Sequence, residues 1–323
     1  MLRKVYDSFN KSSGRRFSLA AMLAVLALAV ISCQTRDTQP AKIVRGQLYV
    51  VATTGIIANV ARVIAGERAV VDELMGPGVD PHLYKASQGD ISRLSSADLI
   101  LYNGLHLEGK MSEALGKMSS QRVTVAVSDD IPREFLRAPP EFNNQFDPHV
   151  WFDVSLWSLA TEKIITALIQ IDPKGEAEYR SRGAAYQDSL AALHTWVTNE
   201  ILRIPEDHRA LVTAHDAFGY FGRAYQIEVY GLQGISTASE YGLNDVTRLV
   251  DMLVERKIKA VFIESSVPPR AIEAVVTGCA ARGHEIVIGG ELFSDALGFR
   301  DTPEGSYLGM VRHNVNTIVE ALR

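Results

Sequence analysis

Short unbroken hydrophobic runs alternate along the chain with segments whose hydrophobic residues recur every three or four positions. The runs are typical of strands buried on both faces of a parallel sheet, and the periodic segments are typical of the helices that cover such a sheet. In the first half of the chain the pattern predicts strands at 48–52, 69–71, 99–102 and 123–127, with helices near 56–65 and 88–96. In the second half it predicts strands at 210–213, 229–232, 260–263 and 285–288, with helices from about 218, at 244–257, after 269 and at 304–322. The chain is therefore predicted to be an α/β protein with two Rossmann-like lobes, each built on a parallel sheet.

A single long helix, residues 173–204, is predicted to join the two lobes. Asp172 and Pro173 suit the N-cap and the first helical position, and Pro205 ends the segment. The apolar residues of this helix keep a helical spacing along one stripe, at Tyr186, Leu190, Leu193 and Val197. A helix of about 30 residues would span roughly 45 Å. Two shorter helices that break near Gly183 are the alternative.

The first 33 residues have the pattern of an export signal. Basic residues precede an unbroken apolar run of 13 residues, 19–31, which is shorter than the roughly 20 residues that span a bilayer. The run leads into a sequence that resembles a bacterial lipobox, so we predict cleavage before Cys33 and lipid attachment to that cysteine; an ordinary signal is the alternative. Residues 34–46 are predicted to form a flexible polar tether. No later segment is predicted to cross a membrane. We therefore expect an extracytoplasmic protein, lipid-anchored to the cell membrane or periplasmic.

These boundaries leave two predicted lobes, 47–172 and 205–323. The net charge of the chain is −5, and the signal carries five basic residues and one acidic residue. After the predicted cleavage the mature protein would therefore have a charge of −9. Such a charge argues against nucleic acid as a partner and favours a cation as ligand. Apart from Cys33 the chain has one cysteine, Cys279, so a disulfide scaffold is excluded and a hydrophobic core must hold the fold. We expect a monomer.

The tripeptide Asp-Pro-His occurs twice, at 80–82 and 147–149, and another histidine, His215, follows a predicted strand. Imidazole is the commonest metal ligand in proteins. The aspartate two residues before His82 and before His149 could accept the ring N–H, a contact that orients most metal-bound histidines. Ligands of open α/β sheets bind beyond the carboxyl ends of the strands. Because the three histidines belong to separate units of both lobes, the sequence predicts a metal site in the cleft between the lobes.

A fourth, negatively charged ligand is expected, because three neutral imidazoles leave a divalent ion short of one ligand and of negative charge. The acidic candidates are Asp295, Glu291, Glu264 and Asp216. Asp295 follows the predicted strand 285–288 by a short loop, much as His215 follows its own strand. Glu264 ends a strand and is instead a candidate acceptor for a ligand's ring N–H, or an acid on the cleft surface. Asp216 adjoins His215, and neighbouring residues rarely converge on one ion.

The remaining histidines have no partner at ligand spacing and are interpreted as structural. They are His106, His194, His208, His284 and His313. The sequence has no His-x-x-x-His or Cys-x-x-Cys pair, which excludes a compact zincin or zinc-finger site.

Five separated motifs make the chain recognisable. In order they are Asp147-Pro-His-Val-Trp-Phe-Asp153, Thr213-Ala-His-Asp-Ala-Phe-Gly-Tyr-Phe221, Gly231-Leu-Gln-Gly-Ile-Ser-Thr-Ala-Ser-Glu240, Phe262-Ile-Glu-Ser-Ser266 and Gly289-Gly-Glu-Leu-Phe-Ser-Asp295. From about Gln47 to its end, the chain resembles the metal-binding components of zinc and manganese ABC importers, above all the TroA-type lipoproteins. The resemblance implies two α/β lobes joined by one backbone helix, with a metal between them. It places the four ligands on His82, His149, His215 and Asp295, and so favours Asp295 over the other acids.

The resemblance also implies a receptor rather than an enzyme, which captures Zn²⁺ or Mn²⁺ as its transported ligand and delivers it to an ABC permease. Three imidazoles and one carboxylate suit zinc, and manganese-dedicated relatives often carry a glutamate where His215 stands. Zinc-dedicated relatives, however, often carry a histidine-rich loop between the first two ligands, and here residues 83–148 hold only His106. We predict zinc, with manganese as the alternative. The competing hypothesis is an extracytoplasmic zinc hydrolase, which needs an open coordination position and a general base such as Glu264.

Limited lobe motion is predicted on metal release, because the interior of the linking helix has no proline to bend it. Gly183 is its one weak point. Local rearrangement is expected instead in the ligand loops, such as the loop 76–78 before His82.

Overall fold

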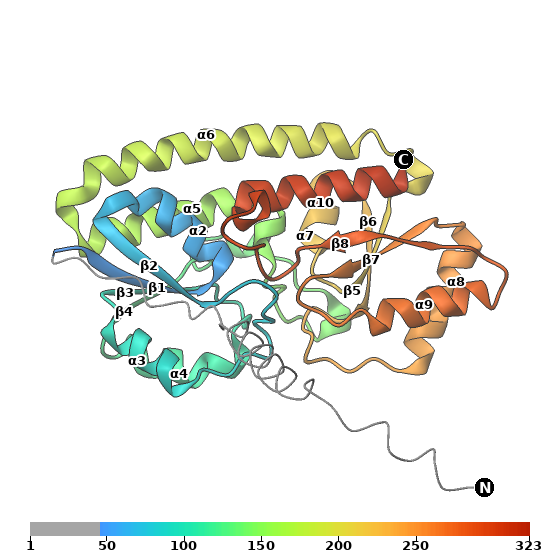
Figure 1. Cartoon of the computed structure of the whole chain (residues 1–323), viewed down its shortest axis with the longest axis horizontal. Coiled ribbons are helices and arrows are strands. Elements are labelled where there is room, and N and C mark those ends of the chain that lie inside the picture. The colour runs from blue at the N-terminus through green and yellow to red at the C-terminus, as the bar shows by residue number, and fades with distance from the viewer. Residues whose placement is uncertain (1–45) are drawn as a thin grey trace, which may run out of the picture. The chain divides into compact units, whose positions relative to one another are not determined.

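The predicted alternation of strands and helices is present in a computed structural model, which describes residues 46–323 (Figure 1). The predictions for the export signal, for Cys33 and for nearly all of the tether lie outside the described residues. The two parallel-sheet lobes and the long helix between them are confirmed. The exact lobe limits, 47–172 and 205–323, stay a prediction, and we use them below to define the N-terminal and C-terminal lobes.

Four parallel strands form the sheet of the N-terminal lobe, in the order β2-β1-β3-β4. The strands are β1 (Leu48–Thr54), β2 (Ala69–Met75), β3 (Leu99–Tyr102) and β4 (Val123–Ala126). The helices of this lobe are α2 (Gly55–Ala65), α3 (Gln88–Ser96), α4 (Ser112–Ser119) and α5 (Val154–Ile171). Successive residues of β1 point to opposite faces, so that Val50 packs in the core with α2 and α5, and Val51 packs with α3 and α4. The sheet is thus covered on both faces, as the unbroken hydrophobic runs predicted.

The C-terminal lobe differs from the prediction in the extent of its sheets. Its strands are β5 (Ala210–His215), β6 (Glu228–Gln233), β7 (Ala260–Glu264) and β8 (Val287–Leu292). They pair in parallel as two separate two-stranded sheets, β5-β6 and β7-β8, while β5 and β7 lie side by side without ladder bonds. The helices are α7 (Gly219–Tyr225), α8 (Leu243–Arg256), α9 (Arg270–Ala280) and α10 (Tyr307–Leu322).

The predicted strand 285–288 is placed too early in the chain, because β8 begins at Val287 and continues through two glycines. At Gly289 a side chain would lie 2.6 Å from Ala321 of α10, and Gly290 has a φ of 147°, which favours glycine. The register between β7 and β8 also shifts at Val261. The glycine pair therefore lets α10 pack directly against the strand rather than ending it.

One continuous helix, α6 (Glu176–Ile201), links the lobes after a short turn of 3-10 helix at its start (Figure 1). The alternative of two helices is wrong, because Gly183 lies inside α6 with its neighbours on one helix. Gly183 is instead a point of close approach between helices. A Cβ atom there would lie 2.5 Å from Cδ1 of Ile165 on α5.

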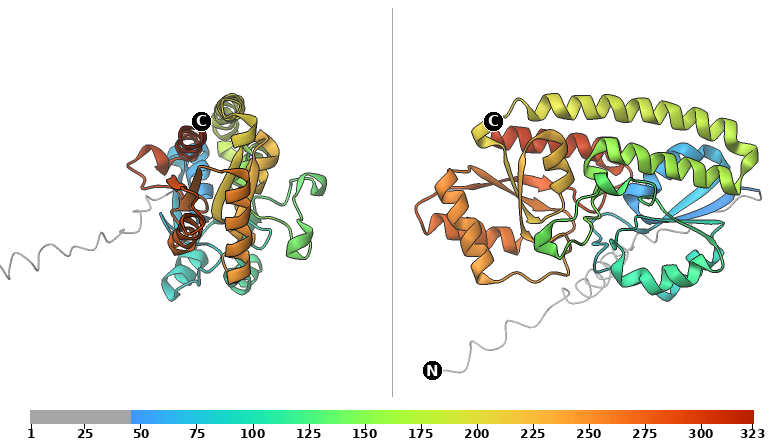
Figure 2. Two further views of the ribbon diagram at one scale, coloured as in Figure 1. Left: turned by 90° about the vertical axis from the view of Figure 1, so that its right-hand side faces the viewer. Right: turned by 180° about the vertical axis from the view of Figure 1, so that it is seen from behind.

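The last helix, α10, is a second connection between the lobes, one that the sequence did not reveal. It runs beside the C-terminal part of α6 in every view (Figures 1 and 2). At its first residue, the backbone N–H of Tyr307 donates to the side chain of Asn59, and its hydroxyl donates to the carbonyl oxygen of Trp151. The hydrophobic core under α6 therefore contains residues of both lobes.

Helix α5 is long and apolar enough to cross a membrane, contrary to the expectation that no later segment would be. Half of it is buried within the protein, and it packs against α6 and α2. We interpret α5 as a core helix, because core helices share this length and composition.

Candidate metal centre

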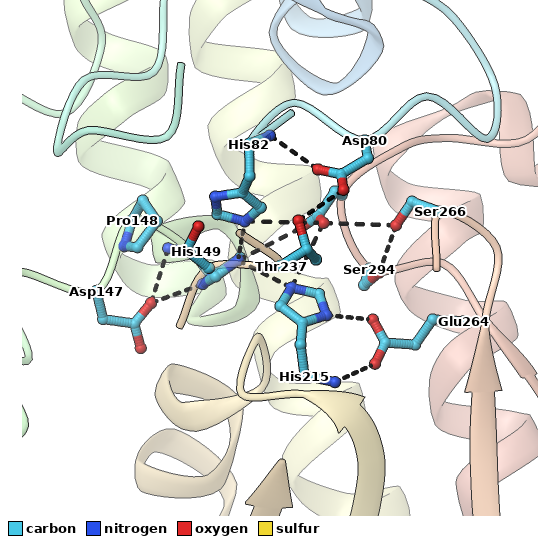
Figure 3. Close-up of polar contacts among 12 residues, drawn as sticks. Asp80, His82, Asp147, Pro148, His149, His215, Thr237, Glu264, Ser266 and Ser294 are labelled. Carbon is cyan, nitrogen blue, oxygen red and sulfur yellow. Dashed lines mark hydrogen bonds and ion pairs between the residues drawn. The ribbon is translucent and has the colours of Figure 1, made fainter. Parts of the chain in front are cut away.

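The structure brings the four predicted ligands together. His82 lies in the loop after β2, His149 directly precedes the 3-10 turn Val150–Phe152, His215 ends β5, and Asp295 follows β8. One nitrogen or oxygen atom of each residue lies within 4.8 Å of those of the other three. The four side chains come from both lobes, and the rings of His82, His149 and His215 point toward one another (Figure 3). None of the four is more than 4% exposed. Within residues 46–323, no other group of three or more His, Cys, Asp or Glu residues has this geometry.

Four of the distances between ligand atoms, at 3.3–3.4 Å, lie close to the edge of a coordination tetrahedron. The Nε2 atom of His149 lies 3.3 Å from Nε2 of His82 and 3.3 Å from Nε2 of His215. Oδ1 of Asp295 lies 3.4 Å from Nε2 of His149. Oδ2 of Asp295 lies 3.4 Å from Nε2 of His215 and 3.9 Å from Nε2 of His82. Zinc–nitrogen bonds of about 2.0–2.1 Å place two tetrahedral ligands about 3.3–3.4 Å apart. The cluster can therefore hold one metal ion once the more distant ligand atoms, which lie within 4.8 Å of one another, move closer together.

Two of the histidines are each held twice by one carboxylate. Asp147 Oδ1 accepts the backbone N–H of His149 at 3.0 Å and lies 2.8 Å from its Nδ1 atom. Glu264 accepts the backbone N–H of His215 at 2.9 Å and lies 2.6 Å from its Nδ1 atom. Each carboxylate favours the tautomer with a proton on Nδ1, which leaves the lone pair of Nε2 directed at the shared point. Two lone pairs 3.3 Å apart repel each other unless a cation lies between them.

The third histidine is held differently, so the prediction for Asp80 is wrong in part. Asp80 Oδ1 accepts the backbone N–H of His82 at 2.8 Å, but the ring of His82 makes no contact with this carboxylate. The other oxygen of Asp80 accepts the hydroxyl proton of Thr237, at 2.6 Å, from the C-terminal lobe. The aspartate of one Asp-Pro-His tripeptide, Asp147, therefore orients the ring of its histidine, whereas the aspartate of the other, Asp80, connects the two lobes.

The electrostatics of the cluster favour a positive charge between the ligands. Burial opposes the charged form of His149 and of His215, but nearby carboxylates outweigh it: Asp147 and Asp295 raise the pKa of His149, and Glu264 and Asp295 raise that of His215 well above its ordinary value. Burial likewise opposes ionisation of Asp295, yet the surrounding imidazoles hold its pKa well below the usual range. Burial lowers the pKa of His82 to about 3. The site thus has an ionised carboxylate and at least one neutral imidazole ready to bind a cation.

The other acidic candidates do not join the ligands. Glu264 contacts Nδ1 of His215, on the side of the ring away from the cluster, which matches the hypothesis that Glu264 accepts a ligand's ring N–H. Glu291 is exposed on β8, and Asp216 directs its backbone N–H to the carbonyl oxygens of Gln233 and Gly234. The five other histidines lie outside the cluster. His194, for example, contacts the hydroxyl of Tyr225, which fits a structural interpretation.

Sequence reasoning missed the residues that support the ligands from further away. Arg137 pairs with Asp147, which in turn holds His149. The indole N–H of Trp151 donates to the carbonyl oxygen of Ser294 at 3.0 Å, next to Asp295. The Trp151 bond ties two ligand segments of different lobes together. Its only signal in the sequence is the position of Trp151 inside a motif, and Arg137 has none.

Two α/β lobes joined by a long helix, with three buried histidines and one aspartate between them, define a solute-binding protein with a metal site. The chain belongs to the family described as zinc-uptake complex component A, periplasmic, whose model matches residues 50–321. This confirms the resemblance found in the sequence motifs. Proteins of this kind are the metal-binding, substrate-binding components of ABC transporters.

The similar proteins cover nearly the whole chain. Manganese-binding lipoprotein MntA of Bacillus subtilis is 49% identical over 308 residues, which are 95% of this chain and 100% of that protein. Zinc-binding protein TroA of Treponema pallidum is 50% identical over 277 residues, 86% of this chain and 89% of that protein. The solved structure of the Treponema pallidum periplasmic zinc-binding protein TroA has a TM-score of 0.84 and 50% identity, and the match covers 86% of this chain and 99% of that one.

Proposed function

We propose that this chain is the extracytoplasmic receptor of a metal importer, which binds one divalent ion through His82, His149, His215 and Asp295 and passes it to an ABC permease. The observation that carries the proposal is the convergence of four buried side chains, whose ligand atoms lie within 4.8 Å of one another. A zinc hydrolase keeps one coordination position open for water, whereas four protein ligands close the site. The geometry therefore supports capture and transport rather than catalysis.

Zinc is the proposed ion. Three imidazole nitrogens and one carboxylate in a closed, roughly tetrahedral arrangement suit zinc, while manganese prefers more oxygen ligands and a higher coordination number. Manganese is the alternative, because both oxygens of Asp295 face the cluster and could bind together. The relatives divide in the same way, since MntA of Bacillus subtilis is named for manganese and TroA of Treponema pallidum for zinc.

A competition titration of the purified mature protein tests the ligands and the metal together. We expect one ion per chain, with Zn²⁺ bound more tightly than Mn²⁺. The Asp295→Ala variant should lose most of its affinity for both ions. Glu291→Ala is the matched control, because Glu291 is an exposed acidic residue near the same segment. If Asp295→Ala binds zinc as the parent does, Asp295 is not a ligand.

We also propose that Cys33 carries a lipid anchor and that residues 34–46 tether the two lobes to the membrane. Each buried lipid methylene contributes about 0.8 kcal/mol, and stable anchoring needs more than one chain. Replacement of Cys33 by serine should release the protein into the soluble fraction. Cys279→Ser, which changes the other cysteine, should leave it on the membrane. Retention of both variants would point to an uncleaved signal segment.

A further inference from the structure

The loop between β6 and α8, residues 234–242, contacts the N-terminal lobe beside the metal centre. The Oγ1 atom of Thr237 donates a hydrogen bond of 2.6 Å to Oδ2 of Asp80 (Figure 3). The two residues are 157 positions apart in sequence and belong to different lobes. The residues that follow Thr237 in this loop are exposed, so the loop approaches the N-terminal lobe from the solvent side.

The carboxylate that accepts the Thr237 hydrogen bond also bonds to one of the ligands, His82. Its second oxygen, Oδ1, accepts the backbone N–H of His82. The carboxylate therefore holds the His82 segment with one oxygen and the C-terminal lobe with the other. Neither Asp147 nor Glu264 joins the lobes in this way, because the side chain of Asp147 contacts His149 and Arg137 of its own lobe and that of Glu264 contacts His215 of its own lobe.

In the segment that carries His82, residues 77–81 make hydrogen bonds only within the segment apart from the bond of Asp80 with Thr237, while Val79 packs against the core of the N-terminal lobe. The segment begins with a Gly-Pro-Gly loop, in which Gly78 has a φ of 72° and is exposed. No carboxylate contacts Nδ1 of His82, whose Nε2 lies 3.9 Å from Asp295, and His82 is the most exposed of the four ligands, at 4%. The hydrogen bond between Thr237 and Asp80 can therefore control whether this segment remains over the ion.

We propose that Thr237 is a positioning residue that closes the His82 segment over the bound metal and sets the rate of metal release. The inference rests on the proposed function. Loss of the hydroxyl frees the carboxylate of Asp80 from the C-terminal lobe while all four ligands remain. The segment then opens more often, and the ion leaves faster. Entry of the ion is little affected, because the segment must already be open for capture.

Stopped-flow release of Zn²⁺ into an excess of a chromogenic chelator tests the proposal. Thr237→Val removes the hydroxyl and keeps the shape of the side chain. We expect its release rate to rise roughly tenfold, which is the effect of losing one hydrogen bond to a charged group. Thr237→Ser keeps a hydroxyl and should release zinc at close to the parental rate. Thr277→Val is the control, because its hydroxyl bonds only within α9.

A structural defect is distinguished by two further readouts. The rate of zinc binding and the thermal midpoint of the metal-free protein should be the same for Thr237→Val and the parent. Parental release from Thr237→Val, or slower binding as the sole change, overturns the proposal. A general loss of stability in Thr237→Val that Thr237→Ser does not rescue also overturns it. If the parent itself binds no zinc or manganese, it is the proposed function that fails. That result is distinct from a failure of the Thr237 proposal, in which the parent binds metal.

Discussion

The two Asp-Pro-His segments have the same three residues, yet their aspartates serve different contacts. Asp147 is fully buried and holds both the backbone and the ring of His149. Asp80 holds only the backbone of His82 and directs its other oxygen to the opposite lobe. The comparison teaches that a local motif fixes the turn before the histidine, whereas the packing around the motif decides what orients the ring.

The difference follows from the neighbours of each carboxylate. Arg137 lies against one oxygen of Asp147 and places a positive charge beside it, while the other oxygen contacts Nδ1 of His149. At Asp80 burial raises the carboxyl pKa, and the nearby partners are the hydroxyl of Thr237 and one backbone N–H. One segment is therefore a rigid part of the site, and the other is held by neutral donors.

Removal of either histidine should have the largest effect and tests whether both segments supply ligands at all. We expect His149→Ala and His82→Ala each to lower zinc affinity by more than the roughly 100-fold that follows loss of an outer partner. His284→Ala is the control, since its ring contacts a backbone carbonyl away from the site. Isothermal titration with a competing chelator measures the three values. Parental affinity in either of the first two variants would remove that segment from the site.

Metal removal should separate the segments by their mobility. The bound ion stabilises the fold by about 4 kcal/mol at 1,000 times its dissociation constant, so a chelator should lower the melting midpoint clearly. In the chelated protein, hydrogen exchange should rise more in residues 79–83 than in 147–151, because Asp147 still holds His149 without metal. Equal exchange in both segments would contradict the comparison, and an unchanged midpoint would contradict the metal site.

The pH dependence of that stabilisation should have a definite sign. The raised pKa values of His149 and His215 mean that these groups stabilise the metal-free fold below the unfolded value of about 6.5, and this contribution is lost as pH rises through the folded values. Metal binding needs the same atoms without protons. The difference in stability between the metal-bound and chelated forms should therefore widen as pH rises above about 6.5. Chemical denaturation across this range measures the difference, and a constant gap would mean that the imidazoles hold no displaceable protons.

The two aspartates should differ when each loses its charge. Asp147→Asn should lower zinc affinity by roughly 10–100-fold, as expected when a ring-orienting carboxylate is lost. Asp80→Asn should cost less than about tenfold, because an amide can still accept from the backbone of His82. Asparagine has nearly the same shape as aspartate, so each of the two substitutions serves as the control for the other. A larger loss in Asp80→Asn would reverse our assignment of rigid and mobile segments.

The smallest expected effect is on the overall dimensions of the protein. Helices α6 and α10 both join the lobes, and Arg300 pairs with Glu73 across them at 3.1 Å. Small-angle scattering should therefore give nearly the same radius of gyration with and without metal, because the change is local to the His82 segment. An opening typical of hinge-closing receptors would show that the two helices do not restrain the lobes.

Much of this arrangement could be predicted from the sequence because it depends on local patterns. Hydrophobic runs mark the strands and the apolar stripe marks α6, although the predicted cap Asp172 precedes a 3-10 turn and α6 itself begins at Glu176. The three histidines could be related by their places in separate units of both lobes, whereas Asp295 was preferred to the other acids only through the family's motifs. Contacts between distant segments leave no local pattern, so the pairing of Asp80 with Thr237 and of Asp147 with Arg137 could not be foreseen. The same holds for β8, where glycines that look like a break serve the packing of α10.

The position of α10 also bears on how the chain acquires its structure. Residues from Tyr307 onward complete a core whose other members include α2 and α5, which are made much earlier. The face of the N-terminal sheet that α2 and α5 cover is therefore not fully buried until the end of the chain is available, whereas the face under α3 and α4 is buried by N-terminal residues alone. Folding should proceed as one late, cooperative event rather than lobe by lobe during synthesis. A chain cut before Tyr307 should consequently lose protease resistance in the first lobe as well as in the second.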